Sequence, residues 1–449
     1  MRLTVHGIGS CAALALVAAS LGACADAGDS FKMPKISELN PFKKPETILA
    51  GKRVDVLTSN DDVEIGANPA AGTTGLPAEF ANDSWSQPGG VASNSPGNLA
   101  LSGTPHAAWK TGIGEGSSKR GRLTASPIVT GGRVFTLDAT GLVSSFNASG
   151  GGSKIWAVSL TPETEPDTQG YGGGLAAEGD VIYAATGYGT VVALSASGGQ
   201  KIWEKSLGSP IRTSPTAADG RVFVNTAEGE FFCLQASDGA ELWRFRGVPQ
   251  VASILNNASP AVSGDMVVVP YPSGEVVALK VASGEAYWAD SVASGGNTSS
   301  LASLADPARP VIDGDMVFAV GHAGKMIATA QKSGARVWSL PVPGKQMPWV
   351  AGGAVYVVDT KGRLRAVSRA KGETIWVAKL AADQSWSGPT LAGGRLWLAS
   401  SKGNLVSVDA ISGKVLDQRD LGDPVYIAPV VAGGRMYVLT DTATLIALN

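Results

Sequence analysis

From residue 101 onward the chain consists of short apolar segments separated by turns that contain glycine. The apolar segments are five to seven residues long and consist mainly of Val, Ile, Leu, Ala, Phe and Tyr. Such segments are typical of β-strands and too short for helices. Gly-Gly, Asp-Gly or Gly-Asp pairs lie between them, for example Gly131-Gly132 and Asp219-Gly220, and favour two-residue hairpin turns with a positive φ.

This pattern repeats eight times, and the units can be aligned on one position. The aligned residues are Pro127, Leu175, Pro215, Pro260, Pro310, Pro348, Pro389 and Pro429. Eight residues after each of them stand Phe135, Tyr183, Phe223, Val268, Phe318, Tyr356, Trp397 and Tyr437. Fourteen residues after the aligned position stands glycine in the first seven units and Ala443 in the last. The spacing between units is that of one four-stranded propeller blade.

A second glycine precedes a tryptophan by four residues in the first six units, from Gly152 and Trp156 to Gly372 and Trp376. Each unit therefore predicts four strands, A to D, with a tryptophan on strand D that packs between blades. In the seventh unit Asp417 takes the place of the tryptophan.

The two ends of the repeat complement each other. The last unit stops at Asn449 after strand C, whereas a surplus D-like segment, Ala107-Ala108-Trp109-Lys110, precedes the first unit. Pairing the two removes an open sheet edge. We therefore predict an all-β fold, an eight-bladed β-propeller of four-stranded antiparallel blades, closed by an N-terminal strand that completes the C-terminal blade.

The first 100 residues carry targeting signals. Cys11 to Leu21 is an apolar run of signal-peptide length, too short to span a membrane as a helix. It leads into Leu21-Gly22-Ala23-Cys24, which resembles the bacterial lipobox, whose cysteine is lipidated; the alternative is an ordinary signal peptide with an incidental cysteine. We predict a lipoprotein signal peptide over 1–23, a lipidated N-terminus and tether over 24–100, and the propeller over 101–449. Ala25 after the cysteine favours the outer membrane.

Composition and charge exclude several function classes. The chain has 36 basic and 38 acidic residues and no basic stripe, which argues against a nucleic-acid partner. After processing, Cys233 would be the one remaining thiol, and its apolar surroundings predict a buried residue. His106 and His322 are too few for a usual zinc site, and His322 is expected as a solvent-exposed residue of a B–C turn. No hydrolase or nucleotide-binding motif occurs, so we expect no catalytic residues, metal or cofactor.

The connections between strand D of one blade and strand A of the next vary in length, whereas the A–B turns are uniform. Variable loops on one face of a rigid ring are a common place for binding sites. The longest of these loops, apart from those at the closing strand and at Leu175, are Arg244–Ser259 and Ala289–Arg309, on adjacent blades. The candidate partner-binding residues in them are Ile254, Leu255, Leu304 and Asp306; the alternative is that the loops merely cover the blade ends. Three residues before each aligned position, near the expected channel mouth, stand Thr124, Gly172, Arg212, Asn257, Pro307, Lys345, Trp386 and Tyr426.

The repeat itself resembles a known type. Gly220-Arg221-Val222-Phe223 and Gly189-Thr190-Val191-Val192-Ala193-Leu194 are similar to the pyrroloquinoline-quinone-type propeller repeat. Two families share it: the quinoprotein dehydrogenases and the BamB family of outer-membrane assembly lipoproteins. The resemblance to the BamB family extends to the lipobox, the chain length, the eight units and the ring closure. Trp85-Ser86-Gln87-Pro88-Gly89-Gly90 resembles the α-proteobacterial form. The dehydrogenases carry an adjacent cysteine pair, which this chain lacks.

The resemblance implies a non-catalytic lipoprotein scaffold on the periplasmic side of the outer membrane. It implies docking on the POTRA domains of BamA, association with other components of the β-barrel assembly machinery, and assistance to unfolded outer-membrane proteins. In the family, contact residues lie on two neighbouring loops, one with a Leu-x-Leu-Arg pattern and one with two aspartates. Ile254 and Leu255 stand near the first pattern without the following arginine, and Asp306 stands near the second. The alternatives are a quinone-dependent dehydrogenase-like propeller and a lipoprotein that binds another envelope partner.

Overall fold

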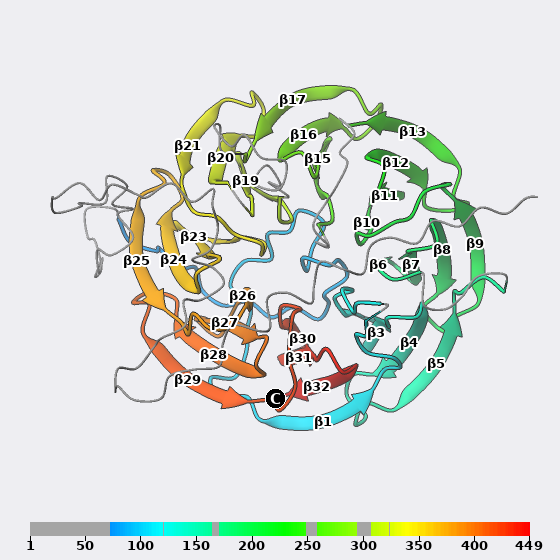
Figure 1. Ribbon diagram of the computed structural model, residues 1–449, viewed down its shortest axis with the longest axis horizontal. Helices are drawn as coiled ribbons and strands as arrows, with labels where there is room; N and C mark the ends of the chain where they lie inside the picture. The colour runs from blue at the N-terminus through cyan, green and yellow to red at the C-terminus, as the bar shows by residue number, and fades with distance from the viewer. Residues whose placement is uncertain (1–71, 120, 164–169, 248–257, 294–306, 323) are drawn as a thin grey trace, which may run out of the picture. The chain divides into compact units, whose positions relative to one another are not determined.

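A computed structural model describes residues 72–119, 121–163, 170–247, 258–293, 307–322 and 324–449, all within one compact unit, residues 63–449. These residues form 32 strands in eight four-stranded sheets, arranged as blades around a central axis (Figure 1). The predicted all-β, eight-bladed propeller is therefore confirmed. In the part of the chain that the structure describes, no helix is long and apolar enough to cross a membrane.

Seven blades take their four strands in chain order, A to D, from the centre of the ring outward. Blade 1 consists of β2 (Ile128–Thr130), β3 (Arg133–Leu137), β4 (Leu142–Asn147) and β5 (Lys154–Ser159). Blade 2 consists of β6 (Gly173–Glu178), β7 (Val181–Thr186), β8 (Thr190–Ser195) and β9 (Lys201–Ser206). Blade 3 consists of β10 (Thr216–Ala218), β11 (Arg221–Asn225), β12 (Glu230–Gln235) and β13 (Glu241–Arg246). Blade 4 consists of β14 (Ala261–Ser263), β15 (Met266–Pro270), β16 (Glu275–Lys280) and β17 (Ala286–Ser291).

The second half of the ring has the same order. Blade 5 consists of β18 (Val311–Asp313), β19 (Met316–Val320), β20 (Met326–Ala330) and β21 (Arg336–Leu340). Blade 6 consists of β22 (Trp349–Ala351), β23 (Ala354–Val358), β24 (Arg363–Ser368) and β25 (Thr374–Lys379). Blade 7 consists of β26 (Trp386–Ala392), β27 (Arg395–Ser400), β28 (Asn404–Asp409) and β29 (Val415–Asp420). Blade 8 consists of β30 (Val430–Ala432), β31 (Arg435–Leu439), β32 (Thr444–Leu448) and β1 (Ala107–Gly112).

Blade 8 closes the ring in the predicted way. β1 pairs antiparallel with β32, with Trp109 opposite Ala447 and Thr111 opposite Leu445. Just beyond the pair, His106 and Asn449 exchange two backbone hydrogen bonds of 2.7 and 2.9 Å. The Trp109 ring lies 6.0 Å from that of Tyr437, the same type of contact that other blades make within one continuous segment. The strand from the N-terminal side therefore substitutes fully for the missing strand D.

The tryptophan of each D strand packs on the glycine in the C–D turn of the next blade. Trp203 shows the contact: its indole N–H donates to the Ala236 carbonyl (2.9 Å), and a Cβ added at Gly239 would lie 2.7 Å from its Cε3. The same arrangement joins Trp109 to Gly152, Trp156 to Gly199, Trp243 to Gly284, Trp288 to Gly334, Trp338 to Gly372 and Trp376 to Gly413. The glycine that precedes each tryptophan in the sequence therefore serves the tryptophan of the preceding blade, and the predicted packing between blades is confirmed.

The ring closure accounts for the one unit without this tryptophan. Blade 8 has no covalent C–D turn, because its strand D comes from the other end of the chain. No turn glycine is there for a tryptophan of blade 7 to cover. Instead, Asp417 pairs with Arg419 (3.0 Å), which donates a hydrogen bond to the carbonyl of Pro105 just before β1.

Because of the tryptophan–glycine contact, a glycine-to-alanine substitution should lower the free energy of unfolding more at a glycine under a tryptophan than at a turn glycine without one. Gly220 and Gly239 have almost the same φ, 72° and 73°, but a Cβ at Gly220 would meet nothing within 4 Å. Gly220→Ala should cost about 1 kcal/mol, because of its left-handed backbone alone. Gly239→Ala should cost about 1–3 kcal/mol more, because the methyl group collides with the Trp203 ring. Equilibrium unfolding in urea measures both, and equal losses for the two variants would contradict the contact.

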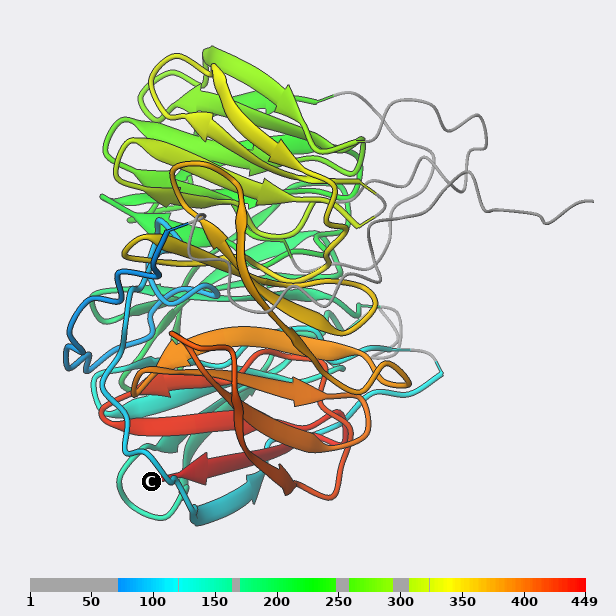
Figure 2. The ribbon, with the colours of Figure 1, turned by 90° about the vertical axis from the view of Figure 1, so that its left-hand side faces the viewer.

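An N-terminal segment, residues 72–103, crosses the ring on the face of the A–B turns, and we call it the plug segment (Figures 1 and 2). It makes at least one hydrogen bond with every blade. The partners in blades 1 to 8 are, in order, Trp85 and Val129, Ser86 and Ala177, Gln87 and Ala217, Ala92 and Val262, Ser93 and Ile312, Thr74 and Gly353, Leu99 and Gly393, and Asn82 and Gly433.

The prediction of a tether over 24–100 is therefore wrong for residues 72–100. The physical reason lies in the A strands, which are the inner edge strands of their sheets and offer unpaired backbone groups to the segment. Trp85 and Leu99 add apolar burial: they are only 2% and 1% exposed, and the Trp85 ring stacks 6.1 Å from that of Trp349. Residues 24–71 lie outside the described residues.

Candidate binding face

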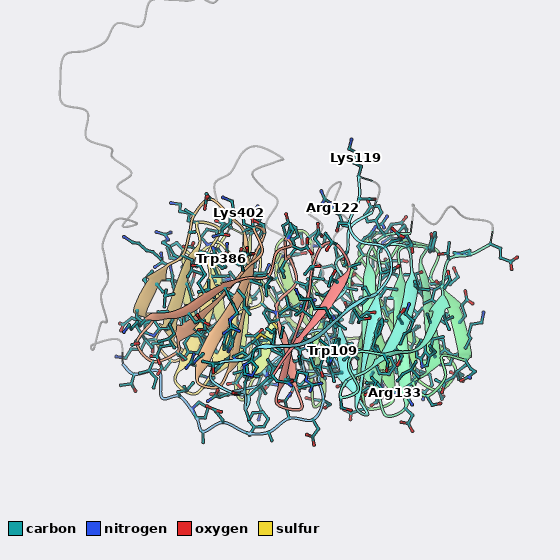
Figure 3. The ribbon with its side chains drawn as sticks, turned by 90° about the horizontal axis from the view of Figure 1, so that it is seen from below. Trp109, Lys119, Arg122, Arg133, Trp386 and Lys402 are labelled. Carbon is teal, nitrogen blue, oxygen red and sulfur yellow. The ribbon has the colours of Figure 1, made fainter. Side chains whose placement is uncertain are left out.

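The two faces of the ring differ in what covers them. The face of the A–B and C–D turns carries the plug segment along its surface (Figure 3). The other face, formed by the D-to-A connections and the B–C turns, we call the open face. Lys119, Arg122 and Lys402 lie toward this face in Figure 3, opposite Arg133. The open face is the one that the variable loop lengths predict for binding.

Both predicted binding loops begin and end on the open face, on either side of blade 4. One joins β13 to β14, and the other joins β17 to β18. The start of the first is held in place, because the Gly247 N–H donates a hydrogen bond to the Gly229 carbonyl (3.0 Å). Ile254, Leu255, Leu304 and Asp306 lie outside the described residues, as does Cys24, so their roles remain predictions.

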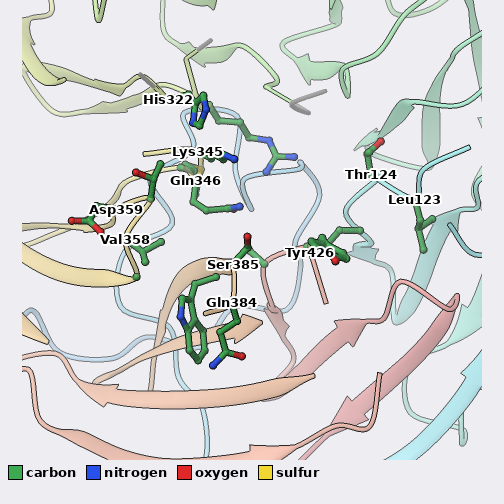
Figure 4. Close-up of a pocket in the computed structure, with 17 residues that line it drawn as sticks. Leu123, Thr124, His322, Lys345, Gln346, Val358, Asp359, Gln384, Ser385 and Tyr426 are labelled. Atoms are coloured by element: carbon green, nitrogen blue, oxygen red, sulfur yellow. The ribbon is translucent and has the colours of Figure 1, made fainter. Parts of the chain in front are cut away.

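A cavity of about 370 Å³ opens at the centre of the open face (Figure 4). Half of the eight positions predicted near the channel mouth line it: Thr124, Lys345, Trp386 and Tyr426. Its apolar wall includes Leu123, Met347, Val358 and Ile427. The cavity is therefore shared by the connection into blade 1 and by blades 5 to 8.

Asp359 is the one acidic side chain that lines the cavity among the described residues, and its charge is already compensated. It accepts hydrogen bonds from the backbone N–H of Lys361 and Arg363 (2.9 Å each) and from the Arg363 side chain (2.7 Å). The Arg365 guanidinium lies 3.6 Å away.

The cationic side chains of the cavity have no such compensation. Within the described ranges, Arg309 and Lys345 form no ion pair, and the buried Nε of Arg309 has no hydrogen-bond partner. Burial lowers the pKa of the Arg309 guanidinium to about 10, which still leaves it charged at neutral pH. The cavity therefore carries a net positive charge.

His322 corrects a sequence-based expectation. It lies in a B–C turn, as predicted, but its side chain lines the cavity and is half-buried, so the expected solvent-exposed position is wrong. Burial and the nearby Lys345 lower the pKa of its imidazole below the usual 6.5. The ring is neutral at pH 7, and its buried Nδ1 has no partner among the residues that the structure places.

Sequence reasoning missed Arg309 and the inward position of His322, because no equivalent Arg or His recurs at these positions in the other units. Cys233 is buried, as predicted, and burial raises the pKa of its thiol to about 12, too high for a nucleophile at neutral pH. Across the described ranges, no three His, Cys, Asp or Glu side chains gather as a possible metal site.

Comparisons with known proteins point to one family. Residues 139–378 and 360–449 match the family model described as "Outer membrane protein assembly factor BamB". The outer membrane protein assembly factor BamB of Yersinia pestis is 25% identical over 362 residues, which cover 77% of this chain and 89% of that protein. That of Moranella endobia is also 25% identical, over 70% of this chain and 81% of its own length.

Solved structures share the fold. The crystal structure of BamB from Moraxella catarrhalis superposes with a TM-score of 0.66 at 17% identity, over 77% of this chain and all of that chain. The quinohemoprotein alcohol dehydrogenase of Comamonas testosteroni gives a TM-score of 0.65 at 14% identity, over 82% of this chain and 80% of its own. At these identities the similarity concerns the propeller fold, which both kinds of protein share.

Proposed function

We propose that this chain, which belongs to the outer membrane protein assembly factor BamB family, docks through its open face on the POTRA domains of a BamA-type barrel. As a member of this family it is a non-catalytic propeller of outer-membrane protein assembly. We further propose that Cys24 is lipidated and holds the chain at the periplasmic side of the outer membrane. In this position the propeller would assist the insertion of unfolded outer-membrane proteins.

The observation that carries the choice of face is the plug segment. The face of the A–B turns is occupied by the chain's own residues 72–103, which hydrogen-bond to all eight blades. A partner of that face would first have to displace this segment. Among the described residues, no segment covers the open face in this way, and the two long loops on either side of blade 4 begin and end there. Rigid strands with long loops at one end are a common arrangement for protein recognition.

Affinity purification tests the proposal. The tagged full-length protein is extracted from membranes with mild detergent, and co-purifying proteins are identified by mass spectrometry. We expect a POTRA-containing barrel among them. The double variant Leu255→Ala, Asp306→Ala should recover at least about tenfold less of it, because truncating two contact residues at the centre of an interface typically costs 2 kcal/mol or more.

The matched control truncates one branched aliphatic residue and one aspartate on the face of the A–B and C–D turns, which we call the covered face. Ile411, 61% exposed, and Asp238 both lie in C–D turns there. Ile411→Ala, Asp238→Ala should recover the barrel at the level of the unchanged protein. Equal recovery by both double variants would contradict docking through the predicted loops.

A further inference from the structure

We propose that the cavity at the centre of the open face is a binding site for an organic carboxylate, whose charged group contacts Arg309 and Lys345 and whose apolar body contacts the opposite wall. The site is independent of the docking proposal, because it uses none of the residues changed in that test.

The charge balance of the cavity calls for an anion. Arg309 and Lys345 have no acidic partner among the described residues, and the one lining carboxylate, Asp359, is already paired with Arg363. A buried cationic group without a counter-charge is unfavourable unless a ligand supplies one. A planar guanidinium binds a carboxylate through two parallel hydrogen bonds, so the Arg309 guanidinium favours a carboxylate as its counter-charge.

Polar neighbours of the cations favour the same ligand. The His322 imidazole is neutral at pH 7, since burial and Lys345 lower its pKa, so it adds a hydrogen-bonding group without adding charge. Gln346 also lines the cavity beside Lys345 (Figure 4). The site thus offers two positive charges and neutral donors. These groups suit one carboxylate better than a more highly charged group such as a phosphate. A phosphate also has no apolar part that could contact the apolar wall.

The remaining wall is suited to an apolar body. Leu123, Val358 and Ile427 line it, together with Trp386. The only polar atom of the Trp386 side chain, its Nε1, already donates to the Ala381 carbonyl (2.9 Å), so the ring offers a ligand only apolar surface. A volume of about 370 Å³ lies in the range of small-molecule sites. An aromatic carboxylate, or the C-terminal residue of a polypeptide, has the required combination of groups.

Calorimetric titration of the full mature protein at low salt tests the site with defined probes. The probe for a small-molecule source is 2-naphthoate, and the probe for a polypeptide end is acetyl-Gly-Gly-Phe with a free carboxylate. The corresponding amides are the controls. We expect the carboxylates to bind and both amides to bind at least about tenfold more weakly, because a charge-assisted hydrogen bond is lost. Stronger binding of naphthoate indicates a small molecule as the natural ligand, and stronger binding of the peptide indicates a chain terminus.

Variants connect the binding to the cavity. Arg309→Gln and Lys345→Gln should each weaken binding of the preferred carboxylate about tenfold or more. The Lys345 side chain is exposed, so Lys345→Gln should fold normally. It therefore tests the site even if Arg309→Gln disturbs folding. The control is Lys402→Gln, which lies toward the same face outside the cavity and should bind normally. The proposal is overturned if neither carboxylate binds, if the amides or inorganic phosphate bind as well as the carboxylates, or if Lys345→Gln has no effect.

Discussion

Replacing residues 107–112 by alternating proline and glycine should reduce the free energy of unfolding by on the order of 5–8 kcal/mol. The exchange keeps the chain length, so the plug segment stays attached, but β1 can no longer pair with β32. Two contributions to stability are lost: about one backbone hydrogen bond for each pair of residues, and the packing of Trp109 on Tyr437 and Gly152. The combined loss is comparable to the whole stability of many domains.

Urea denaturation measures this loss, and a peptide provides the stricter test. A synthetic peptide of residues 104–113, added to the exchanged protein, should bind at the free edge of β32 and restore the unfolding midpoint. The control is a peptide of the same ten residues in scrambled order, which should leave the midpoint of the exchanged protein unchanged. An unaltered midpoint after the exchange of 107–112 would show that the ring does not depend on this strand.

Gln87→Glu should give the second large loss, about 3–5 kcal/mol at pH 8. The Gln87 amide is 3% exposed, and its Nε2 donates to the carbonyls of Ala177 (2.8 Å) and Ala217 (2.9 Å), in blades 2 and 3. Its Oε1 accepts from the Ala217 N–H (3.0 Å). A carboxylate cannot donate to either carbonyl, so the substitution places a buried negative charge against two acceptors.

The loss should depend on pH with a defined sign. Burial beside carbonyl oxygens raises the pKa of the new carboxyl group in the folded state above its unfolded value of about 4.3. The penalty is therefore small at pH values near the unfolded pKa and grows as the pH rises toward the folded pKa. Denaturation at pH 5 and pH 8 should show a greater loss at pH 8. The exposed Gln200→Glu is the control, and the same small change for both variants would contradict the role of Gln87.

The propeller could be predicted from the sequence because its determinants recur. Strand length, turn glycines and the spacing between Gly239 and Trp243 all repeat in neighbouring units, so each unit supports the interpretation of the others. The closing strand was also predictable, since the surplus of one strand at the start matches the deficit at the end. The replacement of the tryptophan by Asp417 in the seventh unit also has a physical cause. This cause is the missing C–D turn of blade 8, which only the structure shows.

The plug segment could not be predicted, because its contacts are neither local nor periodic. Asn82 donates to the carbonyl of Val431, 349 positions away, and most of the hydrogen bonds between the segment and the blades use backbone groups on at least one side. Backbone groups occur in every residue, so these contacts leave no pattern in the sequence. The cavity could be predicted in part. Counting from the repeat places Lys345 and Trp386 at the channel mouth. The positions of Arg309 and His322 in the cavity follow only from the packing of blade 5.

Site-specific photo-crosslinking distinguishes the two faces, since we propose that the open face, and not the covered face, meets the assembly machinery. A photo-reactive residue is introduced at Leu255, in the loop before blade 4, or at Ile411, 61% exposed on the covered face. The full-length protein is irradiated in intact cells, and its adducts are identified by mass spectrometry. We expect an adduct with a POTRA-containing barrel from position 255 and none from position 411. An adduct from position 411 alone would contradict the proposal.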